Sequence, residues 1–263
     1  MKNLSFVLAI IAMTFLAFNN PMTPEEKGLE IAKSADIADQ GFGSVRVNLT
    51  MTLKNRNGQT SVRNMSSSTL EQTIDGDKSL IVFKSPKDVS GTAILTYTHK
   101  EGPDDQWLYL PAIKRVKRIS SSNKSGPFMG SEFAYEDLSS QEVEKYTYKF
   151  LKEEKLNGAN TSVVERYPVD TKSGYARQVV WYNNDKDLRL EKTDFYDRKN
   201  QLLKTLTYSD YKQFLNKHWR AETFTMINHQ TGKETVLKFE NYDFGVGLTE
   251  NDFTQNSLKR AGR

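Results

Sequence analysis

The chain has 263 residues, no cysteine and a formal net charge of +4. The absence of cysteine excludes disulfide bonds, a thiol nucleophile, cysteine-ligated zinc and a lipid-modified cysteine after a leader. So small a net charge does not favour nucleic acid as a ligand, and a chain of this length can bury a full core as one domain.

The first twenty residues have the pattern of a secretory signal peptide. Lys2 precedes an apolar run at residues 4–18, and a polar break with a proline follows. This run has secretory length and is too short to span a bilayer comfortably as a permanent helix. We therefore expect residues 1–20 to be a signal peptide and residues 21–263 to form a single exported domain. An uncleaved N-terminal anchor is the alternative.

A helix is predicted over residues 23–40. Thr23 is a suitable N-cap, Pro24 falls at the first helical position, and two glutamates occupy the first turn. Gly41 follows the last periodic residue, so it closes the helix and releases the chain into the strands.

From residue 45 onward, apolar residues recur at every second position. Between residues 45 and 54 they alternate with polar ones, which is typical of a half-buried antiparallel strand. A meander of about thirteen such strands that curls into an open or closed barrel is therefore predicted. The further runs lie at residues 61–71, 79–83, 92–97, 106–110, 114–119, 146–151, 162–166, 177–182, 188–195, 202–208, 219–227 and 234–239.

The segment 106–138 contains an aromatic strand and an apolar loop. Trp107 and Tyr109 share one face of the strand, and leucines share the other, so both faces are candidates for burial. In the loop, Phe128 and Phe133 would cost free energy if left in water. They either complete the core or cover an apolar cavity as a lid, and both interpretations stay open.

The strand after the aromatic one is strongly basic. Its positive charges can protect a sheet edge from edge-to-edge aggregation. They can also bind anionic lipid headgroups or an acidic membrane partner, with about 1 kcal/mol for each charge near such a surface. Both interpretations stay open. The candidate residues for partner or headgroup contact are Lys114, Arg115, Lys117 and Arg118.

No catalytic or metal-binding motif is present in the sequence. The three histidines lack metal-ligand spacing, and no nucleophile-elbow or phosphate-loop pattern occurs. Glu132, Glu136 and Asp137 can supply paired carboxylates for acid–base chemistry, but we expect them to be surface charges. The prediction is therefore a protein without enzymatic activity, cofactor or metal. A hydrolase is the alternative, and it requires these carboxylates to converge in a cleft.

Several motifs in this segment resemble those of outer-membrane lipoprotein-sorting proteins, which are related to the periplasmic lipoprotein carrier LolA. The matching motifs are WLYLP at 107–111, FMGS at 128–131 and YEDL at 135–138. The resemblance implies a mainly β fold, in which a strongly curved antiparallel sheet forms an incomplete β-barrel. An N-terminal helix and a helical or loop lid would close its concave side over an apolar cavity. It also implies no catalytic residue. The chain is longer than a simple lipoprotein carrier.

We therefore expect a monomeric periplasmic carrier or binding protein for lipid or lipoprotein acyl chains. Since the resembling proteins often occur beside proton-driven exporters of the RND type, an inner-membrane exporter and an outer-membrane acceptor are the expected partners. The alternative is an envelope scaffold or exporter subunit without a ligand cavity, docked through its basic strand. The candidate cavity or lid residues are Trp107, Tyr109, Phe128, Met129, Phe133 and Tyr135.

Overall fold

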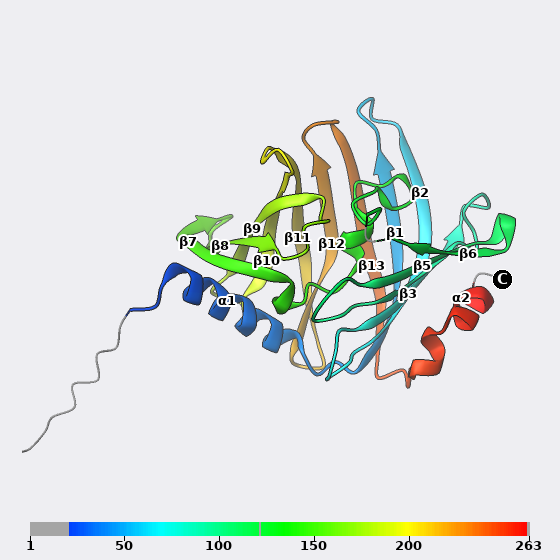
Figure 1. Cartoon of the computed structure of the whole chain (residues 1–263), viewed down its shortest axis with the longest axis horizontal. Coiled ribbons are helices and arrows are strands. Elements are labelled where there is room, and N and C mark those ends of the chain that lie inside the picture. Colours follow the sequence, from blue (N-terminus) through cyan, green and yellow to red (C-terminus); the bar gives the residue numbers. More distant parts are fainter. Residues whose placement is uncertain (1–20, 121, 262–263) are drawn as a thin grey trace, which may run out of the picture.

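The structure is a computed structural model that describes residues 21–120 and 122–261, so the predicted signal peptide lies outside the described residues (Figure 1). Thirteen strands form one sheet in the order β6-β5-β4-β3-β2-β1-β13-β12-β11-β10-β9-β8-β7. Every strand is antiparallel to the strands that it pairs with, and β1 pairs with β13 to join the two halves. Because the edge strands β6 and β7 do not pair with each other, the sheet is curled but not closed. The predicted mainly β meander with an N-terminal helix is confirmed.

The sheet is an almost uninterrupted run of hairpins. Its strands are β1 (Ser44–Lys54), β2 (Thr60–Leu70), β3 (Lys78–Ser85), β4 (Ala93–Tyr97), β5 (Asp105–Leu110), β6 (Arg115–Ile119), β7 (Tyr146–Leu156), β8 (Ala159–Pro168), β9 (Tyr175–Asn183), β10 (Arg189–Asp197), β11 (Leu202–Phe214), β12 (His218–Asn228) and β13 (Lys233–Phe244). The α-helices are α1 (Pro24–Asp39) and α2 (Gln255–Ala261). Short 3₁₀ helices are η1 (Pro111–Ile113), η2 (Phe128–Gly130), η3 (Tyr135–Leu138), η4 (Val143–Lys145) and η5 (Glu250–Phe253).

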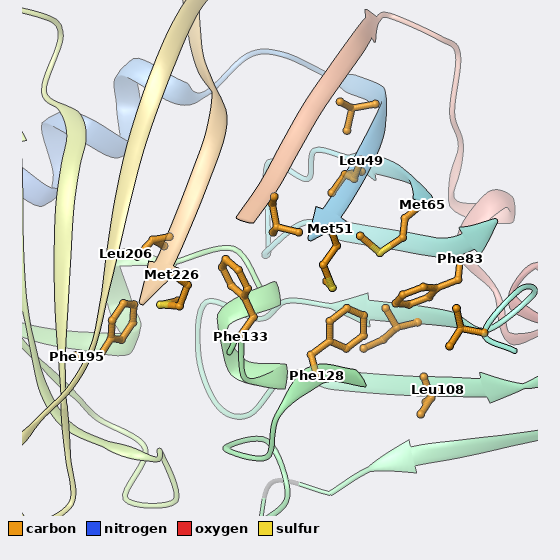
Figure 2. Packing of buried hydrophobic residues seen from close by; sticks show 14 of the residues in the cluster. Leu49, Met51, Met65, Phe83, Leu108, Phe128, Phe133, Phe195, Leu206 and Met226 are labelled. Carbon is orange, nitrogen blue, oxygen red and sulfur yellow. The ribbon is translucent and has the colours of Figure 1, made fainter. Parts of the chain in front are cut away.

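The inner face of the curled sheet carries the main apolar core. Leu49 of β1 lies opposite Met65 of β2, and Met65 lies opposite Phe83 of β3, so a row of apolar side chains crosses neighbouring strands. Phe128 and Phe133 reach into this core from the long connection between β6 and β7, as Figure 2 shows. The rings of Phe83 and Phe128 lie 5.6 Å apart.

The outer face of β3 to β5 is covered by the C-terminal segment. Leu95 and Tyr109 lie on this face, and they pack with Phe253 and Leu258. Helix α2, which contains Leu258, was not predicted from the sequence. It has only seven residues, and its stability comes from packing against the sheet rather than from a local helical pattern.

Helix α1 agrees closely with its prediction. Thr23 accepts a hydrogen bond from the backbone N–H of Glu26, and Glu26 accepts one from Thr23, which forms a capping box. The helix packs along β7 at Gly28, where an added Cβ would lie 2.8 Å from the backbone nitrogen of Phe150. No helix among the described residues is both long and apolar enough to cross a membrane.

The close approach at Gly28 predicts that Gly28→Ala destabilises the protein. An alanine in an exposed helix would add about 1 kcal/mol of stability through helix propensity. At Gly28 the new methyl group meets the backbone of β7, so the melting temperature should fall. Ser34→Ala on the exposed side of the same helix is the control and should leave the melting temperature unchanged or slightly raised. Equal melting temperatures for Gly28→Ala and the wild type would contradict this packing.

Candidate functional site

A cavity of about 1100 Å³ lies between α1 and the inner face of the sheet. Its helical wall comes from the second half of α1, and its floor comes from strands β7 to β13. Residues 140–143, which include the start of η4, form another side. The cavity lies beside the main core on the same face of the sheet, because Tyr208 and Phe224 contact both.

Aromatic side chains form much of the sheet wall of this cavity. The ring of Tyr208 meets that of Phe224 edge-on, with centroids 4.9 Å apart, and Phe224 in turn contacts Phe239 at 4.7 Å. Burial raises the pKa of Tyr208 to about 12, so its phenol is neutral at physiological pH. The aromatic wall therefore offers apolar ring surface with uncharged hydroxyl groups.

Seven acidic side chains of the described residues also line the cavity, and burial disfavours the charged form of three of them, Asp36, Asp77 and Glu142. Burial, together with the negative charge of Asp77, raises the pKa of Glu142 from 4.5 to about 7. Burial raises the pKa of Asp77 from 3.8 to about 6, and it also raises the pKa of Asp36 on α1. Near neutral pH, Glu142 and Asp77 therefore carry less negative charge than ordinary carboxylates.

The six predicted ligand residues do not line this cavity. Trp107 and Tyr109 lie on the outer face of β5, in or against the cluster under α2. Phe128 and Phe133 are 1% and 3% exposed, and they complete the main core. Met129 and Tyr135 pack against the same core. Phe133 also lines a smaller hollow of about 720 Å³. A ligand-binding role for the six residues stays a prediction.

Residues 125–138, named the strap here, cross the inner face and are tied to both halves of the sheet. On one half, Arg63 of β2 donates to the carbonyl of Met129, and Gln106 of β5 donates to the carbonyl of Tyr135 at 3.0 Å. On the other half, Lys204 of β11 donates to the carbonyl of Glu132 at 2.9 Å. The strap is therefore a fixed brace in this structure.

The prediction that Glu132, Glu136 and Asp137 are surface charges is wrong. Asp137 accepts from the ammonium group of Lys204 at 2.6 Å, and its side chain is 6% exposed. Glu136 accepts from the backbone N–H of Gly174 at 2.9 Å. Glu132 accepts from Asn228 at 2.7 Å. Because a buried loop must satisfy its polar groups, each carboxylate has its own partners and serves to hold the strap.

The basic strand is β6, one of the two sheet edges. Its Arg115, Lys117 and Arg118 are exposed, and Arg118 forms an ion pair with Asp105 of β5. Lys114 precedes the strand in a left-handed backbone conformation, so β6 begins one residue later than predicted. This position fits the protection of an edge strand, while contact with a partner or headgroup stays a prediction.

The cavity was missed because its lining follows from sheet curvature. Tyr148, Tyr182 and Tyr208 lie in strands whose alternation is the same for a solid core and for a hollow one. Arg166 offered a signal, since it shares a strand face with Val164 two residues earlier, and the structure shows that it is buried. A buried cation in such a strand indicates a polar requirement on the inner face.

Removal of the buried ion pair should release the strap. In Lys204→Met, the carboxylate of Asp137 stays buried without its cation, and breaking such a pair costs about 3–5 kcal/mol. Urea denaturation should show this loss. Lys212→Met is the matched control, because Lys212 lies on the same strand as Lys204 and pairs with Glu222 of β12 but is 64% exposed, so its loss should cost less than about 1 kcal/mol. Similar small losses in both variants would show that the pair does not hold the strap.

The raised pKa of Glu142 predicts a stability that falls with rising pH. The folded state binds this proton more tightly than the unfolded state, so its stabilising effect is complete below pH 4.5 and is lost as pH rises through about 7. The melting temperature should therefore fall between pH 5 and pH 8, and Glu142→Gln should reduce that fall. Glu144→Gln, on an exposed neighbour, should not reduce it. An unchanged pH profile in Glu142→Gln would contradict the assignment.

Comparisons with known proteins place the chain in a family. A family model described as an uncharacterized protein matches residues 75–260. A putative outer membrane lipoprotein-sorting protein domain from Vibrio parahaemolyticus is 56% identical, with a TM-score of 0.88, covering 90% of this chain and 100% of that chain. A DUF1329 family protein from Desulfovibrio piger is 31% identical over the same shares, with a TM-score of 0.84. No curated protein matches.

A more distant structure extends the fold comparison. A LolA superfamily protein from Nitrosomonas europaea is 20% identical, with a TM-score of 0.71, and it covers 90% of this chain and 100% of that chain. At this identity the similarity concerns the fold alone. The resemblance that the motifs indicated is confirmed: the chain belongs to the outer membrane lipoprotein-sorting protein family.

Proposed function

We propose that this protein is a non-enzymatic periplasmic carrier that binds a lipid or lipoprotein acyl chains in the cavity beneath α1. The observation that carries this proposal is the aromatic-walled cavity of about 1100 Å³ on the inner face of the sheet. A relative at 56% identity is described as a lipoprotein-sorting domain, which supports a lipid-type ligand. Pockets for small ligands combine apolar and aromatic surface with polar groups that fix the orientation of the ligand. This wall likewise combines aromatic rings with many charged and polar side chains.

The energetics of an acyl chain fit such a cavity. Each methylene taken out of water contributes about 0.8 kcal/mol, so ten methylenes contribute about 8 kcal/mol before the costs of association. Apolar burial of this kind tolerates chains of different length because it is not directional. This tolerance of different chain lengths suits a carrier that must accept and release its ligand.

In this proposal α1 is the lid, and the strap is not. The strap is fixed by side chains from both halves of the sheet, including the buried pair of Lys204 and Asp137. Helix α1 buries Gly28 and Ala32, and Leu29, Ile31 and Ala35 pack against the neighbouring cluster of apolar residues. Its second half forms the helical wall of the cavity, so a displacement of α1 would open the cavity.

The proposed partners are those that a periplasmic lipid carrier requires. An inner-membrane exporter would supply the ligand, an outer-membrane acceptor would receive it, and the protein would work as a monomer between them. The exposed basic edge at β6 is the proposed contact with anionic headgroups or with one of these partners. The alternative of a scaffold with a solid sheet is less well supported, because the inner face is hollow beneath α1.

A bulky side chain inside the cavity should block ligand binding. Ala35 on α1 lines the cavity, so Ala35→Trp should reduce co-purified lipid by at least about tenfold relative to the wild type, measured by native mass spectrometry of protein from the periplasm. Ser34→Trp, on the exposed side of the same helix, should carry as much lipid as the wild type. Circular dichroism would confirm that both variants fold. Wild-type protein without lipid, or equal lipid in both variants, would contradict the proposal.

A further inference from the structure

Two cationic side chains are buried in the part of the chain that the structure describes, and only one of them has a counter-charge. Lys204 is 3% exposed and is neutralised by Asp137 at 2.6 Å. Arg166 of β8 is 6% exposed, and no carboxylate of the described residues lies within ion-pair distance of it. Burial of a charge without a counter-charge is unfavourable, so Arg166 requires an explanation.

The partners of Arg166 in the structure are all neutral. Its Nε donates to Oε1 of Gln178 at 2.8 Å, and one terminal nitrogen donates to Oε1 of Gln141 at 3.1 Å. Its guanidinium group lies over the ring of Tyr146, 4.5 Å from the ring centroid. Two of the five N–H donors of the guanidinium thus have protein acceptors within the described residues, which leaves donor capacity for another group.

This donor capacity opens onto the cavity. Arg166 lines the cavity, and so does Tyr182, whose side chain is buried and whose hydroxyl has no hydrogen-bond partner among the residues described. Burial raises the pKa of the Tyr182 phenol, and the charge of Arg166 opposes that shift, as expected for neighbouring groups. A buried cation and a neutral hydroxyl therefore line the same cavity.

Four other cations of the described residues line the cavity. In that part of the chain Arg189 has no ion pair and its Nε is without a hydrogen-bond partner, but it is only partly buried and lies over the rings of Tyr211 and Trp219. Lys100 donates to the carbonyl of Thr73. Arg220 forms an ion pair with Asp39 of α1. Lys217 is exposed and donates to the carbonyl of Gln40. Of the acidic groups in the cavity wall, neither Asp77 nor Glu142 pairs with Arg166. Among the described cations of the cavity wall, Arg166 is thus the one that is buried, and it has no ion pair.

We propose that Arg166, with Tyr182, binds the anionic group of an amphiphile whose apolar chain occupies the cavity. The inference rests on the proposed function and adds the ligand class, a long apolar chain that ends in a phosphate or carboxylate group. Planar guanidinium groups suit both anions, because two parallel N–H donors match two oxygen atoms. Removed from water, such an interaction discriminates strongly against a neutral headgroup.

The experiment compares two lipids that have the same oleoyl chain and differ in their headgroup. Displacement of an apolar fluorescent dye from delipidated protein would be measured with 1-oleoyl lysophosphatidate, with monooleoylglycerol, and with glycerol 3-phosphate. The wild type should bind lysophosphatidate at least about tenfold more tightly than monooleoylglycerol, and glycerol 3-phosphate should not displace the dye. Arg166→Gln should lose about tenfold in affinity for lysophosphatidate and change by less than about twofold for monooleoylglycerol.

Two further variants separate charge from structure. Arg166→Lys keeps the positive charge and should retain part of the preference for lysophosphatidate. Arg177→Gln is the matched control, because Arg177 lies on the next strand, outside the cavity wall, and pairs with Glu165 at 2.7 Å. It should bind both lipids as the wild type does. If Arg166→Gln fails to fold, the comparison of the two lipids on wild-type protein decides.

The outcomes separate failure of the anion site from failure of the proposed carrier function. Equal affinity of the wild type for the two lipids would overturn the anion site and leave the carrier function standing. An equal loss for both lipids in Arg166→Gln would show that Arg166 only supports the fold. Tight binding of glycerol 3-phosphate without benefit from the chain would indicate a free anion site and overturn the ligand class. Binding of neither lipid would overturn the proposed function itself.

Discussion

The structure depends on one constraint: a sheet of thirteen strands that curls without closing has an apolar inner face that its own strands cannot cover. Apolar side chains from neighbouring strands form continuous rows on that face. Two segments cover it unevenly. The strap fills one part with Phe128 and Phe133, whereas α1 spans another part and leaves a hollow of about 1100 Å³. Core and cavity are thus two parts of the same inner face. Side chains of the strap fill the first part, and α1 leaves the second part hollow.

This uneven cover explains where polar groups are buried. The strap crosses an apolar surface as irregular chain, so its backbone and acidic groups need partners, and Lys204, Asn228 and Gln106 supply them from the sheet. Around the cavity the pattern differs. Tyr208 is a neutral phenol, and Glu142 resists ionisation near neutral pH. Arg166 keeps donors without acceptors. Such a lining suits a ligand that is mostly apolar and has a single charged end.

Local patterns predicted the elements well and the site poorly. The capping box at Thr23 and the period-two alternation depend on neighbouring residues, so the helix, the thirteen strands and the family motifs were all readable. The burial of Glu136 and Asp137 was not readable, because their partners lie about forty to seventy residues away in sequence. The aromatic strand at Trp107 attracted attention for its composition, yet its aromatic face packs under α2 on the outer side.

For this protein, the amino-acid sequence alone was sufficient for the fold class, the N-terminal helix, the strand number and the family, since these follow from periodicity, caps and short motifs. The tertiary structure was needed to show which face of the sheet is concave, that the strap is a brace, and that the cavity lies beneath α1. Alternation along a strand separates two faces without indicating which of them curls inward. Curvature is a property of the whole sheet, and the positions of Arg166 and Tyr182 within the cavity wall follow from it.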